Sequence, residues 1–327
     1  MYNRQTVNEA MEKKVIPYMT PNQFYAEYLD SAAKPLLSRA AHDPEGKYPS
    51  KEIFSIMKIE EFSKFIKFPI MPARSTVYEF FWMKKGEMVR TDILQKYIVG
   101  QGNVCFCKEG IIKSIDSCTA DAEGYFVIFD KEFVLHFLKN QNSLDDLPYF
   151  QDEGSPVVKL NQDSNQEVGG LLDKIYNEQQ VNLPDRQQYI GILLCQFLIM
   201  MRRESGSTVN KRNHSAAEII TLRFIKRLKQ DVLKHKSVLH YANALNVTAN
   251  HLNKCVKEST GKPVTTHISE MIVLEAKVML KQGDANISEI AIRLGFENIS
   301  YFTRHFRKHT GYTPTHFRDK FILQVVT

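Results

Sequence analysis

The sequence lacks a long apolar run, and this absence argues against two classes of protein. Its longest apolar stretch covers residues 189–201 and is interrupted by Gln196, whereas a membrane-spanning helix needs roughly 20 apolar residues. The first ten residues are polar and contain no apolar segment of the kind that a signal peptide requires. We therefore expect no secretory leader, no membrane partner and a cytoplasmic location.

Cysteine and histidine are also scarce. The five cysteines are scattered and odd in number, which argues against a disulfide framework and for a reducing compartment. Only His42 and His136 precede His214, and a metal-dependent cupin enzyme needs several converging His and acidic ligands. The sequence also shows no nucleophile beside a base and no phosphate loop. We therefore expect no enzyme, no catalytic residues, no metal and no cofactor.

Positive charge is present but concentrated in one part of the chain. The net charge is +6 over 327 residues. Residues 208–327 carry 19 Lys and Arg against 9 Asp and Glu, whereas residues 1–207 carry 24 against 28. A basic region attached to a mildly acidic one indicates a polyanion partner for the basic region. Charge alone leaves an ordinary solvated basic surface equally open.

The first region, residues 1–160, reads as mainly β. Short runs rich in β-forming residues cover 77–82, 96–99, 104–107 and 124–129, and Gly-containing turns separate them. Strands of this length and spacing predict a sandwich or barrel. Flanking helices are expected at residues 22–41 and 131–140.

The second region, residues 161–205, reads as two helices. Apolar residues from Val168 to Tyr176 recur with a helical period, Pro184 breaks the pattern, and a second apolar stripe runs from Ile190 to Met201. These helices pack either on their own domain or against a second copy of the chain, and the pattern alone leaves both open. The polar residues 206–215 read as a linker.

The third region, residues 216–327, contains an internal repeat. Residues 241–263 and 290–314 each read as helix, tight turn, helix, Gly and Pro. The small Ala242 aligns with Ala291, and the turn residue Asn246 aligns with Gly295. Asn and Gly both tolerate the left-handed backbone that a sharp helix-to-helix turn needs. Thr248 and Asn298 follow as predicted N-caps of the second helix. The repeat therefore predicts two helix-turn-helix units.

The second helix of each unit is predicted to have one apolar face and one polar, basic face. The polar face carries Asn250, Asn253, Lys254 and Lys257 in the first unit, and Ser300, Thr303, Arg304, Arg307 and Lys308 in the second. Arg, Lys, Asn and Thr are the residue types that read base edges in a major groove. A single unit is equally well explained as a helical hairpin whose polar face meets water. Two matched units in a basic region favour binding to double-stranded DNA.

A long helix is predicted between the units, over residues 265–281. It would hold the two reading helices apart at a fixed distance. If both enter successive major grooves, they should lie about 34 Å apart on one face of the DNA.

At these residues the chain resembles the DNA-binding domain of the AraC family of transcription regulators. The resemblance spans residues 217–318, and its most specific part is residues 290–318. It implies base contacts by Asn250, Asn253 and Lys254 in the first unit and by Ile299, Ser300, Thr303 and Arg304 in the second. Lys257, Arg307 and Lys308 are expected to hold phosphates. The first unit departs from the family pattern at Lys254 and Val256, where Arg and an aromatic residue are common.

Residues 78–86 and 124–133 resemble the cupin-like sensor domain of the same family. The resemblance implies a homodimer formed through the helices after the barrel, contact with RNA polymerase, and a barrel that holds either a small-molecule effector or nothing. The expected fold is thus multidomain: a mainly β cupin-like barrel with flanking helices, followed by an all-α domain with two helix-turn-helix units. The alternative is a cupin-type enzyme or small-molecule carrier whose basic helical tail is only an interaction module.

Overall fold

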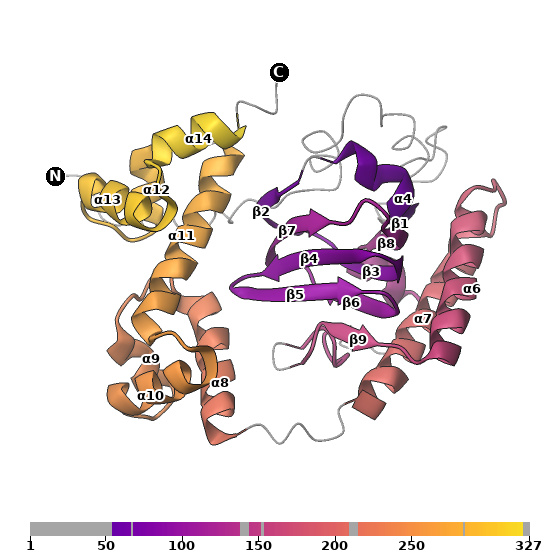
Figure 1. Cartoon of the computed structure of the whole chain (residues 1–327), viewed down its shortest axis with the longest axis horizontal. Coiled ribbons are helices and arrows are strands. Elements are labelled where there is room, and N and C mark those ends of the chain that lie inside the picture. Colours follow the sequence, from indigo (N-terminus) through magenta and orange to yellow (C-terminus); the bar gives the residue numbers. More distant parts are fainter. Residues whose placement is uncertain are drawn as a thin grey trace.

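The chain folds into a β-rich N-terminal part and an all-helical C-terminal part (Figure 1). The structure, a computed structural model, describes residues 54–66, 68–137, 144–151, 154–208, 215–283 and 285–322. The predicted fold class is confirmed. The helix predicted at residues 22–41 lies outside the described residues.

Two antiparallel sheets form the N-terminal part. One has the order β1 (Phe54–Lys58), β8 (Glu123–Phe129), β3 (Tyr78–Lys85), β6 (Asn103–Cys107) and β9 (Val157–Lys159). The other has the order β2 (Ile70–Arg74), β7 (Ile112–Cys118), β4 (Glu87–Asp92) and β5 (Gln95–Gly100). The sequence predicted β3, β5, β6 and β8 and missed the remaining strands, because strands such as β4 and β7 mix polar and apolar residues.

Strand β3 shows how the first sheet is buried on both faces. Glu79, Phe81 and Met83 face the space between the sheets, and residues from the opposite side of the strand pack in a separate core. That core lies under α5 (Lys131–Leu135), α6 (Gln162–Gln179) and α7 (Arg186–Thr208). In Figure 1 these last two helices cover the outer side of the sheet. A strand buried on both faces reads as a continuous apolar run, which is why β3 was visible in the sequence.

The break predicted at Pro184 separates α6 from α7. Helix α7 continues to Thr208, beyond the predicted boundary at residue 205. Ser205 is buried, and its hydroxyl donates to the carbonyl oxygen of Met201 one turn earlier. This bond lets a polar residue stay within the helix. Of the predicted linker, residues 209–214 lie outside the described residues.

The helical part contains α8 (Ala216–Asp231), α9 (Val238–Ala244), α10 (Ala249–Thr260), α11 (Val264–Gln282), α12 (Ile287–Arg293), α13 (Ile299–Thr310) and α14 (Pro314–Ile322). The predicted long helix is confirmed as α11. Pairs α9–α10 and α12–α13, hereafter the first and second units, lie toward opposite ends of α11 (Figure 1). None of the helices among the described residues is long and apolar enough to span a membrane.

The two parts of the chain contact each other through β2 and the β4–β5 turn. Arg74 Nη2 donates to both carboxylate oxygens of Glu275 on α11, at 2.8 and 2.9 Å. Glu275 is only 2% exposed, and burial raises its pKa while Arg74 opposes that shift. In the turn, Ile93 and Leu94 pack against the core of the helical part. The backbone of Ile93 is left-handed, with φ 58°, which is strained for a β-branched residue.

Candidate nucleic-acid interface

The turns of both units have the backbone that the sequence predicted. The φ angle is 55° at Asn246 and 69° at Gly295, so both residues occupy the left-handed region. Ala242 and Ala291 are fully buried, which is consistent with a close approach between the two helices of each unit.

The recognition helices α10 and α13 begin and end as predicted. The Thr248 side chain accepts a hydrogen bond from the His251 N–H, and the Asn298 side chain accepts bonds from the N–H groups of Ser300 and Tyr301. Gly261 and Gly311 terminate the helices with φ angles of 74° and 79°. Residues of matched type at matched positions therefore fix the ends of both helices.

Apolar residues bury one face of each recognition helix. Leu252 and Val256 are fully buried on α10, and Phe302 and Phe306 are fully buried on α13. Because these faces are turned to the core, the remaining face of each helix is presented outward.

Most residues predicted to contact DNA lie on this outward face. Exposed side chains are Asn250, Lys254 and Lys257 on α10, and Ile299, Ser300, Arg304, Arg307 and Lys308 on α13. Asn253 and Thr303 are half-buried. Asn253 Oδ1 accepts from the N–H of Val264 at 3.1 Å, so this side chain caps the start of α11, where Pro263 offers no side-chain cap. The amide nitrogen of Asn253 is the group left for a base.

The cations of this surface are available to an external anion. Within the described part of the chain, Lys254, Lys257, Arg304, Arg307 and Lys308 form no ion pair. Lys and Arg side chains that neutralise phosphates release the cations condensed on the DNA, and this release drives the sequence-independent part of DNA affinity.

Tyr301 is a surface residue that the sequence interpretation missed. Its side chain is 58% exposed on the first turn of α13, between Ser300 and the buried Phe302. An aromatic side chain beside two predicted base-contacting positions is able to touch a thymine methyl or the sugar edge. Its place in the run Ile299–Phe302 could have signalled exposure, because only every third or fourth position of a helix faces the core.

Residues 241–320, which contain both units, match a family model described as a helix-turn-helix domain. The C-terminal region therefore contains a helix-turn-helix domain. The boundaries of this match enclose every residue predicted to contact DNA.

The relatives of the chain are transcription regulators. The uncharacterized HTH-type transcriptional regulator YijO of Escherichia coli strain K12 is 26% identical over 159 residues, covering 48% of this chain and 55% of YijO. The activator RhaR of Yersinia pseudotuberculosis serotype O:3 (strain YPIII) is 24% identical, covering 41% and 46%. The activator RhaS of Escherichia coli O1:K1 / APEC is 23% identical, covering 69% and 79%. The chain thus spans about half the length of the first two relatives.

Solved structures of ToxT from Vibrio cholerae align with this chain. Unsaturated fatty acid bound ToxT from Vibrio cholerae strain SCE256 is 18% identical, covering 84% of this chain and 96% of ToxT, with a TM-score of 0.37. A TM-score this low does not establish a shared arrangement of the whole chain.

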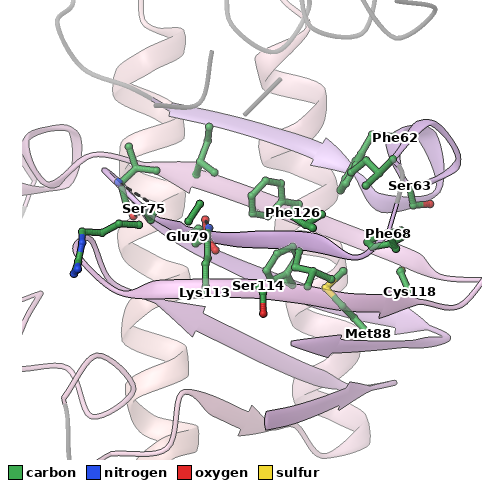
Figure 2. Close-up of a pocket in the computed structure, with 18 residues that line it drawn as sticks. Phe62, Ser63, Phe68, Ser75, Glu79, Met88, Lys113, Ser114, Cys118 and Phe126 are labelled. Carbon is green, nitrogen blue, oxygen red and sulfur yellow. Dashed lines mark hydrogen bonds and ion pairs between the residues drawn. The ribbon is translucent and has the colours of Figure 1, made fainter. Parts of the chain in front are cut away.

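The N-terminal part holds a second candidate site, a cavity between the two sheets. Its volume is about 60 Å³, whereas one water needs about 10–15 Å³. Figure 2 shows Ser75 at one end, Phe62 and Phe68 at the other, and Glu79 and Lys113 between them. The lining is otherwise mainly apolar, so the cavity suits a small molecule with an apolar body.

Charged side chains lie at the wall of this cavity. Lys113 donates to Glu79, whose other carboxylate oxygen lies 3.5 Å from Nη1 of the fully buried Arg90. Arg90 also pairs with Asp92. Burial lowers the pKa of Lys113 to about 7. The sequence interpretation named none of these residues, although Glu79 inside an apolar strand was a readable signal.

Cys105 and Cys107 alternate along β6 and share its inward face, and both are buried. Burial raises the pKa of each thiol to about 12. Thiols with such pKa values are poor nucleophiles at neutral pH. They act as apolar packing groups here.

Proposed function

We propose that this chain is a sequence-specific DNA-binding transcriptional regulator that places α10 and α13 in successive major grooves. The observation that carries the proposal is the pairing of two units with matched turns, caps and outward basic faces. Two helical hairpins whose polar faces only meet water would not need the same turns, caps and basic faces. A cytoplasmic location and contact with RNA polymerase belong to the same proposal.

The roles of the outward residues follow from their chemistry. In this proposal Arg304 and Lys254 donate to guanine, and Asn250 pairs with adenine. Ser300, Thr303 and Ile299 contact base edges or thymine methyls. Lys257, Arg307 and Lys308 lie farther along the helices and bind phosphates, which fixes register without reading sequence. Asn253 contributes through its amide nitrogen.

The test is an unbiased selection of DNA sequences by the full chain, followed by titration of the selected duplex at several salt concentrations. We expect one preferred sequence and a steep fall of affinity with salt. A duplex of scrambled sequence is the control. The proposal would be refuted if the chain bound the scrambled duplex and the selected duplex with equal affinity at every salt concentration.

We also propose that the chain forms a homodimer through α7. The buried face of α7 packs on its own sheet, but Tyr189, Ile192 and Ile199 are exposed at 45, 51 and 36%. These positions recur at helical spacing and form one outer stripe. A second copy related by a two-fold axis would bring the same stripe to the same stripe.

Sedimentation measurements test the dimer. Ile192→Asp should shift the chain toward the monomer, since it places a charge in the centre of the stripe. Asn177→Asp, an equal charge change at an exposed position of α6, is the control and should leave the dimer intact. A monomeric wild-type chain at micromolar concentration would contradict this proposal and leave DNA binding to be judged separately.

The cavity is proposed as the effector site, and β2 as its link to the DNA-binding part. Ile70, Ala73 and Arg74 of β2 line the cavity, while Arg74 also holds Glu275 on α11. A ligand that displaces β2 would therefore change the contact with the helix that joins the two units. Such coupling is worth about 5- to 150-fold in affinity in typical cases.

The effector proposal can be tested by screening compounds against the wild-type chain and matched variants. Compounds that raise the melting temperature of the wild-type chain but not of Ile128→Trp, in which the cavity is filled, are cavity ligands. These ligands should change the DNA affinity of the wild-type chain and leave that of Glu275→Gln unchanged. An equal response of both chains would show that the coupling does not pass through Arg74 and Glu275.

A further inference from the structure

Lys236 links the loop that precedes the first unit to the turn of the second unit, and this link does not pass through α11. It lies in the loop between α8 and α9, and its ammonium group donates to the carbonyl oxygen of Gly295 in the turn of the second unit. The same group lies 4.0 Å from the centre of the Phe296 ring. Lys236 is half-buried, and desolvation lowers its pKa. The hydrogen bond and the cation–π contact together hold the Lys236 side chain in this position.

The turn of the second unit approaches this loop closely. A Cβ atom added at Gly295 would lie 3.1 Å from Lys236 Nζ and 3.2 Å from the carbonyl oxygen of Leu233. The loop therefore meets the turn with backbone as well as side chain. Gly295 and the matching turn residue of the first unit, Asn246, are both exposed.

Phe296 transmits this contact to the recognition helix. Its ring packs on Phe302, with 5.3 Å between centroids, and on His305, with 5.6 Å. Both residues belong to α13. The second unit is thus held by α11 along its base, by α14 against α13, and by Lys236 through Phe296.

We propose that Lys236 determines the spacing of the DNA half-sites that the chain accepts, as a positioning residue that fixes α13 relative to α10. The Lys236 attachment, which lies away from α11 and α14, prevents the second unit from pivoting about α11. DNA whose half-sites are one base pair closer or farther apart presents the second groove shifted and rotated by about 34–36°, given 10–10.5 base pairs per turn. A rigid pair of helices cannot follow that change. The proposal rests on the proposed function, because it requires both units to contact DNA.

The test compares Lys236→Met with Lys234→Met in the full chain. Both variants lose one positive charge from the same loop, but Lys234 is exposed, and within the described residues its side chain forms no hydrogen bond or ion pair with the second unit. Affinity is measured for the selected duplex and for duplexes with one base pair inserted or deleted between the half-sites. We expect the wild-type chain and Lys234→Met to lose at least about tenfold on altered spacing, and Lys236→Met to lose less than about threefold. Equal losses in the two variants would overturn the proposal.

Two further measurements separate spacing from stability and from DNA binding. Lys236→Arg keeps a donor and a cation over Phe296, so it should restore the spacing preference; failure of a folded Lys236→Arg to do so counts against the proposal. Hydrogen exchange without DNA should be faster in residues 294–302 of Lys236→Met than of Lys234→Met. If exchange in these residues is the same in both variants, the proposal for Lys236 is overturned, and this result does not depend on DNA. If the chain selects no DNA sequence, the proposed function is refuted instead.

Discussion

The first and second helix-turn-helix units share one backbone design but realise it with different residues. The second unit fills its core with Phe296, Phe302 and Phe306, whereas the corresponding positions of the first unit hold Val247, Leu252 and Val256. Turns, caps and helix ends agree in conformation between the units. The comparison shows that the backbone of the motif tolerates a large change in side-chain volume, provided that the left-handed turn and the two caps are kept.

The outward faces of the two recognition helices also differ, and the second unit again has the larger set of residues. Helix α13 presents three cations, Arg304, Arg307 and Lys308, whereas α10 presents Lys254 and Lys257. In the first unit, Asn253 is also drawn into capping α11. The second unit therefore has the larger core and the larger set of groups free for DNA. Substitutions at matched positions of the two units measure how far this contrast extends.

The largest effect is expected from truncating the cores. Phe306→Ala should lower the free energy of unfolding by about 3–5 kcal/mol, because it empties a fully buried aromatic site. Val256→Ala removes two methyl groups and should cost about 1.6 kcal/mol. Urea unfolding of the full chain measures both. Equal losses would show that the second unit does not depend on its aromatic core.

A smaller effect is expected from removing one base contact in each unit. Arg304→Ala should weaken binding to the selected duplex by about 1–3 kcal/mol and relax preference at one position. Lys254→Ala should weaken binding less, because an ammonium group lacks the planar fork with which a guanidinium pairs with two acceptors. Titration against single-base variants of the duplex is the measurement. A uniform loss across all variants for Arg304→Ala would reassign Arg304 to the DNA backbone.

The two turns should respond to substitution by different amounts. Gly295→Ala should destabilise the chain by about 1–2 kcal/mol, since an L-residue at φ 69° is strained, and its Cβ would crowd Lys236 and Leu233. Asn246→Gly should change stability by less than about 0.5 kcal/mol, because glycine adopts the φ angle of 55° at this position without strain. Thermal unfolding compares the pair. Similar losses at both positions would argue that the loop contact at Gly295 adds nothing.

The caps offer the finest comparison. Asn298→Ala and Thr248→Ala should each cost about 0.5–2 kcal/mol. Asn298 accepts from two backbone N–H groups and Thr248 from one, so the loss at Asn298 should be the larger. Denaturant midpoints of the two variants, with the corresponding serine substitutions as controls, decide the order. A larger loss at Thr248 would contradict the hydrogen-bond assignment.

Much of the C-terminal part could be predicted from the sequence because its determinants are local. Left-handed turn residues, N-caps and the helical period each act within a few positions, so Asn246, Gly295, Thr248 and Asn298 were all identified with the conformation that they adopt. Strands buried on both faces, such as β3, were visible for the same reason.

The features that escaped prediction depend on residues far apart in the chain. Arg74 and Glu275 are 201 positions apart, and no local pattern marks either as the partner of the other. The bond from Asn253 to Val264 requires knowing how α10 meets α11, and Lys236 reaches Gly295 across 59 positions. Arg90 and Lys113 were hidden because the mixed strands β4 and β7 give no sign of which polar residue points inward.

The β4–β5 turn has a consequence for how freely the two parts of this chain could be recombined. Ile93 and Leu94 form an apolar tip that is covered by the helical part, and Ile93 keeps a strained backbone there. If the β-rich part were joined to a different DNA-binding domain, this tip would lie bare and Arg74 would lose its carboxylate. The two parts have therefore become fitted to one another, and a chimaeric regulator built at residues 209–214 would need a matching surface to replace Glu275 and the core around Ile93.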